Sequence, residues 1–195
     1  MNVGKMELVE GPKLQAMLDA NSFSPAVMVK MFLPILEARC NNKRRSGLIT
    51  TSSMGAKVVA SGNVMYHSSK VMVNYLMEAV CYELKKANSK VDVMNLIPGG
   101  VFTNMVRQAE GDPASRAGPT LRCLGGIVPV SQCVNGALRD ISRETESTGT
   151  LIHDFQLWWA KWLYKFDLIP PYDGLFKKEK PEPTRVIYPD EPAIP

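Results

Sequence analysis

A tyrosine and a lysine one helical turn apart could transfer a proton in this chain. Tyr66 and Lys70 stand at positions i and i+4, so a helix would place both side chains on one face. Carbonyl reduction needs a hydride on carbon and a proton on oxygen, and the proton donor must reach the carbonyl oxygen. A phenol is a poor donor at its reference pKa of about 10, and a nearby ammonium lowers that pKa. The pair therefore indicates a tyrosine acid activated by a lysine.

A serine thirteen residues before the tyrosine is the third candidate. Ser53 follows a predicted strand over residues 48–52, and ligands of open α/β sheets bind at the carboxyl ends of strands. Its hydroxyl could hold a substrate oxygen beside Tyr66. Taken singly, Tyr66 and Lys70 could be an ordinary surface pair, and Ser53 could be a turn or a cap. Their spacing, the strand–loop–helix context and the later Pro98-Gly99 favour a shared site.

Alternating helices and strands must position these residues. Ser24-Pro25 provides an N-cap and a first-turn proline for a helix. Apolar periodicity predicts helices over 25–39, 64–87 and 130–143 and strands over 48–52, 91–97 and 149–153. Residues 103–118 are rich in Gly, Pro, Ala and charge, which predicts a loop. The alternation predicts an α/β fold with three parallel strands that pair in sequence order and helices that cover them.

Composition excludes several classes of function. The chain has 195 residues and a net charge of +4, and it lacks the basic clusters with interleaved aromatics that nucleic-acid binding requires. Its four cysteines form no C-x-x-C pair, and with only two histidines the sequence has no metal-ligand spacing. No run of eighteen apolar residues occurs, so we expect no membrane span.

The motifs together resemble the short-chain dehydrogenase/reductase superfamily from Asn2 to about Phe176. The resemblance implies a doubly wound, Rossmann-like sheet, of which this chain carries the C-terminal part. It implies a catalytic tetrad of Asn21, Ser53, Tyr66 and Lys70, in which the asparagine holds a water that links the lysine to solvent. It also implies NADP(H) or NAD(H) as cofactor, bound by Asn2, Gly4, Tyr66, Lys70, Pro98, Gly99, Val101 and Thr103.

A narrower resemblance comes from the C-terminal part. Gly149-Thr150-Leu151-Ile152-His153, followed by Trp158 and Trp162, is similar to the closing strand and aromatic helix of the 17β-hydroxysteroid dehydrogenase and very-long-chain 3-oxoacyl-CoA reductase group. This implies reduction of a 3-oxoacyl-CoA or a steroid ketone in lipid metabolism and fatty acid elongation. It also implies association with the endoplasmic reticulum membrane; the residues alone would place the chain in the cytoplasm.

The glycine-rich turn of that superfamily has no counterpart in this sequence. None of the glycines stands between a first strand and a helix that could receive a pyrophosphate. We therefore expect a chain truncated before its cofactor-binding half, with weak NAD(P) binding in isolation. Three functions stay open: a reductase seen as a fragment, a catalytically dead binding or structural subunit, and a half-enzyme completed by a partner. An exposed sheet edge would favour a protein partner or self-association.

The chain divides into three predicted segments. Residues 1–153 form the partial Rossmann-like domain, 154–176 an aromatic helix and extension, and 177–195 a proline-rich tail. The helical aromatic stripe over 155–166 has two interpretations. It could pack against the domain or a partner, or it could make peripheral contact with a membrane, where tryptophans beside lysines suit the headgroup region.

Overall fold

A computed structural model describes residues 6, 9–58, 63–104 and 126–166 of the chain. Its centre is a parallel sheet of three strands in the order β1-β2-β5: β1 (Ser46–Thr51), β2 (Val91–Leu96) and β5 (Glu146–Ser147). β1 pairs with β2 along its whole length, from Ser46 opposite Val91 to Thr51 opposite Leu96. The predicted α/β class, the parallel pairing and the sequence order of the strands are confirmed.

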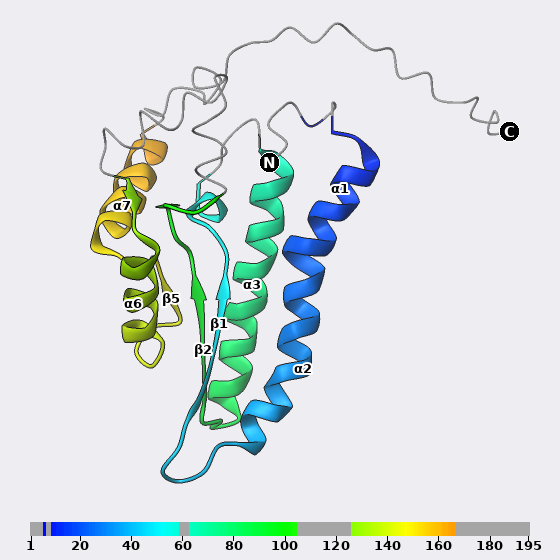
Figure 1. The fold of residues 1–195 in the computed structure, drawn as a ribbon, viewed down its shortest axis with the longest axis vertical. Helices are drawn as coiled ribbons and strands as arrows, with labels where there is room; N and C mark the ends of the chain where they lie inside the picture. Colours follow the sequence, from blue (N-terminus) through cyan, green and yellow to red (C-terminus); the bar gives the residue numbers. More distant parts are fainter. Residues whose placement is uncertain (1–5, 7–8, 59–62, 105–125, 167–195) are drawn as a thin grey trace, which may run out of the picture.

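Helices cover both faces of this sheet (Figure 1). On one face α2 (Ser24–Ala38) and α3 (Val64–Lys86) pack over one apolar cluster, and on the other α6 (Val130–Asp140) packs over a second. The alternation of β2 explains the division, because Val91 and Val93 belong to the first cluster and Met94 and Leu96 to the second. Both faces of β2 are buried, as expected of a central parallel strand.

The N-terminal helical region differs from the prediction. The chain runs without a break from α1 (Gly11–Leu18) through a π-helical turn (Asp19–Phe23) into α2, so Ser24 is not an N-cap. In the π-turn the Ser24 N–H bonds the Asp19 carbonyl, five residues back. An ordinary α-turn would press the Pro25 ring against the Asn21 carbonyl, and the wider turn relieves that clash.

The predicted last strand over 149–153 is wrong. The third strand is the shorter β5, which pairs Asn95 with Glu146 and Leu96 with Ser147. Helix α7 (Leu151–Lys165) begins where the strand was expected, so it spans both sides of the predicted segment boundary at residue 153. Two short strands outside the main sheet, β3 (Gly100–Val101) and β4 (Ile127–Val128), pair in parallel.

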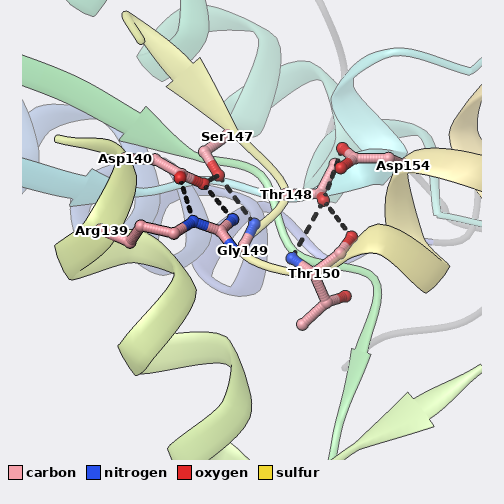
Figure 2. Close-up of polar contacts among 7 residues, drawn as sticks. All are labelled: Arg139, Asp140, Ser147, Thr148, Gly149, Thr150 and Asp154. Carbon is pink, nitrogen blue, oxygen red and sulfur yellow. Dashed lines mark hydrogen bonds and ion pairs between the residues drawn. The ribbon is translucent and has the colours of Figure 1, made fainter. Parts of the chain in front are cut away.

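Backbone geometry and capping explain this correction (Figure 2). Gly149 adopts φ +79°, which favours glycine and turns the chain out of the sheet direction. The Thr150 hydroxyl accepts the His153 N–H, and Thr148 Oγ bonds Asp154 Oδ1 at 2.8 Å. These bonds satisfy first-turn groups of α7 and place a carboxylate at its N-terminus. Gly136 of α6 approaches Gly149 so closely that a Cβ added at Gly136 would collide with the Gly149 carbonyl oxygen.

The helix expected over the aromatic stripe is present as α7, and the five aromatic side chains of the stripe are exposed. Rings of Phe155, Trp158, Trp159, Trp162 and Phe166 follow one another at centroid distances of 4.9–6.2 Å. Leu157 is buried instead, so α7 attaches to the domain by another face. None of the helices in the described residues combines the length and hydropathy needed to cross a bilayer.

Candidate active site

Tyr66 and Lys70 lie on one face of α3, as the spacing predicts. Lys70 Nζ is 5.8 Å from the centroid of the Tyr66 ring. The same ammonium donates to the carbonyl oxygen of Thr51, the last residue of β1, at 3.2 Å. Both side chains are half-buried. The Lys70 ammonium therefore lies near the Tyr66 ring and is bonded to the carboxyl end of β1.

Burial acts on the charge of this lysine. Loss of solvent lowers the pKa of the Lys70 ammonium below its ordinary value. The acceptor at Thr51 is a neutral carbonyl, so it holds the position of the ammonium without neutralising its charge. The site thus presents a partly desolvated positive charge beside the Tyr66 ring, where a negative charge on the phenol oxygen would be stabilised.

Ser53 stands two residues beyond Thr51, at the entry to a short 3-10 turn (Met54–Ala56). Its Oγ accepts the Gly55 N–H at 3.1 Å, so it does act as a cap. The hydroxyl hydrogen is not used in that bond and stays available for donation. The turn packs on the start of α3, since a Cβ at Gly55 would lie 2.6 Å from the His67 ring. The structure thus brings the Ser53 turn against the helical turn that carries Tyr66.

Asn21 is connected to the same site by a hydrogen bond to α3. Its side-chain amide donates to Ser69 Oγ at 3.2 Å, and the neighbouring Ser22 hydroxyl donates to the Ser69 carbonyl at 3.1 Å. Ser69 directly precedes Lys70, and its own hydroxyl donates to the Tyr66 carbonyl at 2.7 Å. The π-turn is therefore tied to the segment of α3 between the tyrosine and the lysine. π-turns inside helices occur often at functional sites.

The segment after β2 closes the same end of the sheet. The Pro98 carbonyl accepts the Met54 N–H at 3.0 Å, which joins this segment to the Ser53 turn. Pro98 and Gly99 are half-buried, Val101 lies in β3 and packs on the second apolar cluster, and Thr103 is exposed. The other two predicted cofactor residues, Asn2 and Gly4, lie outside the described residues, as does most of the predicted 103–118 loop.

Three contributors escaped the sequence analysis. Ser52 is buried and donates its hydroxyl to the Lys70 carbonyl at 3.0 Å, and Ser69 receives the Asn21 bond. Serines are common beside both motifs, and nothing in their spacing separates these two from Ser68. His153, expected at a strand end, is instead a fully buried residue in the first turn of α7. Among the described residues, no group of His, Cys, Asp and Glu could hold a metal ion.

Comparison with known proteins decides the family. A sequence model described as short chain dehydrogenase matches residues 1–114, more than half of the chain. The chain belongs to the short-chain dehydrogenase family. The match covers all four predicted tetrad positions, so the resemblance to the superfamily is confirmed.

Individual relatives agree at lower identity. A dehydrogenase/reductase of CLA biosynthesis from Lactiplantibacillus plantarum is 28% identical over 100 residues, which are 51% of this chain and 34% of that protein. A solved 7β-hydroxysteroid dehydrogenase superposes with a TM-score of 0.67 at 20% identity, over 82% of this chain and 57% of the neighbour. A 3-ketoacyl-(acyl-carrier-protein) reductase from Brucella melitensis, complexed with NADH, superposes with a TM-score of 0.58 at 18% identity. The superposition covers 74% of this chain and 56% of that reductase.

These matches bear on the fold and on length. At such identities the two structures show a shared fold, that of the Rossmann-like short-chain dehydrogenases. The chain spans about a third of the length of the curated relative and little more than half of each solved chain.

Proposed function

We propose that this chain carries the proton-transfer site of a short-chain dehydrogenase that reduces a ketone with NADPH or NADH. The contact that carries the proposal is the Lys70 ammonium, which lies 5.8 Å from the Tyr66 ring centroid and bonds Thr51 at the carboxyl end of β1. A surface pair would not need this anchor in the sheet. Ser53, two residues further on, adds a hydroxyl at the same strand end.

The side chains at this strand end suit the nicotinamide end of the cofactor. An ammonium has three N–H donors, and the Thr51 bond uses one, which leaves donors for ribose hydroxyls. The exposed hydroxyl of Thr103 offers a donor and an acceptor for a carboxamide, beside the backbone of Pro98, Gly99 and Val101, in which the Pro98 carbonyl and the Gly99 N–H are already bonded to Met54 and His153. When bound, the cofactor supplies the hydride that the carbonyl carbon receives.

The remaining chemistry is assigned to the side chains. Tyr66 gives its phenolic proton to the carbonyl oxygen as that oxygen gains negative charge, so the ketone becomes an alcohol. Ser53 donates a hydrogen bond to the same oxygen and orients the ketone. Lys70 stabilises the phenolate left on Tyr66. Asn21 holds the turn of α3 that carries this pair, and we assign to it the water that returns a proton toward Lys70.

A 3-oxoacyl-CoA or a steroid ketone is the proposed substrate class. The support from this chain is the sequence Gly149–His153 with Trp158 and Trp162, which resembles the 17β-hydroxysteroid dehydrogenase and 3-oxoacyl-CoA reductase group in its residues, although Leu151–His153 begin α7 and do not form a closing strand. The names of the two solved neighbours, a hydroxysteroid dehydrogenase and a ketoacyl reductase, point to the same two kinds of ketone.

Cofactor oxidation measured with both kinds of ketone tests the proposal. The 195-residue chain would be mixed with NADPH or NADH and either substrate, and the loss of reduced cofactor followed. Tyr66→Phe should lower turnover by about 10²–10⁴-fold, the usual contribution of a general acid. Tyr82→Phe is the matched control, because Tyr82 is 70% exposed on the same helix. Turnover that survives Tyr66→Phe would refute the assigned acid. No turnover with any pair would favour a binding subunit or a half-enzyme that needs a partner.

A further inference from the structure

His153 is a fully buried ring that the proposed chemistry does not use. It lies in the first turn of α7 with 0% of its surface exposed, beneath the segment that follows β2. Its own backbone N–H is held by the Thr150 hydroxyl. The bond between Thr148 and Asp154, drawn in Figure 2, fixes the same turn. The position of the ring is therefore set by the cap of α7, which leaves both ring nitrogens for other partners.

Both ring nitrogens contact backbone groups near the site. Nδ1 accepts the Gly99 N–H at 3.3 Å, and Nε2 lies 3.2 Å from each of the carbonyl oxygens of Gly100 and Gly126. A nitrogen that accepts a hydrogen bond carries no proton, so the ring hydrogen belongs on Nε2, where two carbonyl oxygens can accept it. A neutral ring in this one tautomer satisfies all three backbone groups.

The segment that His153 holds is also in contact with Met54. A Cβ at Gly99 would lie 2.7 Å from His153 Cδ2 and 2.8 Å from Met54 Sδ, so Gly99 packs directly against both the ring and the methionine. The preceding Pro98 carbonyl receives the Met54 N–H, and Met54 follows Ser53 directly. A chain of contacts therefore runs from His153 through Pro98-Gly99 to the Ser53 turn.

We propose that His153 is a positioning residue of this active site, whose buried ring fixes the Gly99–Gly100 backbone and, through Pro98 and Met54, the Ser53 turn. The inference rests on the proposed function, because it assigns the ring a role in aligning that site. The catalytic groups lie on three separate elements, the π-turn, the Ser53 turn and α3, and the contact from α7 holds the Ser53 turn through the segment that follows β2. A displacement of about 1 Å at such a site can cost about a hundredfold in rate.

Three variants separate positioning from bulk stability. His153→Phe keeps an aromatic ring and removes both polar contacts, while His153→Gln keeps a donor near the Nε2 position. Leu84→Ala is the control, since Leu84 is buried near the end of α3 at the other end of the sheet and should lower stability without touching the site. Amide hydrogen exchange of Gly99 and Met54 would be measured in each variant, together with kcat and KM for the ketone.

We expect the effect of the His153 substitutions on hydrogen exchange to be confined to the backbone that the ring contacts. His153→Phe should speed exchange at Gly99 and Met54 at least tenfold beyond its effect on the other core amides, and should lower kcat about 10- to 100-fold. His153→Gln should recover part of both, and Leu84→Ala should leave kcat unchanged. Exchange at Gly99 and Met54 that merely follows global stability, with kcat retained, would overturn the proposal. If the wild-type chain shows no turnover, the proposed function fails, and the exchange data still decide whether His153 fixes this backbone.

Discussion

Asn21 and Ser69 are hydrogen-bonded across two helices, from the π-turn before α2 to the turn of α3 between Tyr66 and Lys70. The amide nitrogen and the hydroxyl oxygen are 3.2 Å apart, and the next residue, Ser22, bonds the Ser69 carbonyl. The distortion of the N-terminal helix and the site are thus one structural unit. A residue predicted from a family motif stands where the geometry gives it a second, positioning role.

Asn21→Ala should weaken both the fold and the site. The lost bond is partly buried, so the free energy of unfolding should fall by about 0.5–1.5 kcal/mol, and kcat should fall because the Tyr66–Lys70 turn loses its tie. Gln15→Ala is the control, since its bond to Asp19 in the same helical run is exposed. Denaturant unfolding and steady-state kinetics would measure both effects. An Asn21→Ala variant as active and as stable as Gln15→Ala would contradict the assigned tie.

The pKa of Lys70 predicts how stability depends on pH. Burial lowers the pKa of the folded ammonium, so between the folded pKa and the unfolded value of about 10.4 the unfolded chain binds more protons. The contribution of Lys70 to the free energy of unfolding therefore rises with pH between these two pKa values. Lys70→Met removes the titration and should lower turnover at least about 10²-fold.

Comparison of the wild type with Lys70→Met isolates the contribution of Lys70 to the pH dependence of stability. The free energy of unfolding of wild type minus that of Lys70→Met should increase as the pH is raised from 7 toward 10, because other titrating groups cancel in the subtraction. Urea denaturation at several pH values would measure it. A difference that stays flat or decreases would show that the lysine is not desolvated in the folded chain.

The close approach of α6 to the start of α7 makes a steric prediction. A Cβ at Gly136 would collide with the Gly149 carbonyl, so Gly136→Ala should destabilise the fold by about 1–3 kcal/mol, as overpacking does. A Cβ at Gly11 would meet nothing within 4 Å, so Gly11→Ala should stabilise α1 by about 0.4–1 kcal/mol. Thermal unfolding of the two variants would compare them directly. Equal effects would mean that the two helices do not meet at Gly136.

Helical and strand periodicity predicted the central elements because those elements are long and buried. Val73, Met77, Val80 and Leu84 repeat along α3, and residues 91–96 form a strand buried on both faces, so the pattern leaves little choice. The same periodicity placed Tyr66 and Lys70 on one face. These were the strongest parts of the sequence interpretation.

Local sequence patterns gave wrong element boundaries where backbone geometry and tertiary contacts determine the structure. Ser24-Pro25 resembles a helix start, yet the widened turn lets the helix continue past the proline. Gly149–His153 has strand-like composition, yet the positive φ of Gly149 and the cap by Thr150 begin a helix there. The roles of Ser52, Ser69 and His153 depend on partners between 18 and 54 residues distant in sequence, which no local pattern records.

Titration calorimetry of the 195-residue chain with NADPH and NADH tests the central claim most directly. Because the glycine-rich turn has no counterpart in this sequence, we expect weak binding of at least one cofactor, with a Kd near the upper end, about 1 mM, of the range in which KM values of enzymes lie. Lys70→Ala should weaken it about tenfold or more, and Tyr66→Phe should keep the binding while losing turnover. No heat of binding at millimolar NADPH or NADH, or binding that Lys70→Ala leaves unchanged, would contradict a cofactor site built around Lys70 and Tyr66.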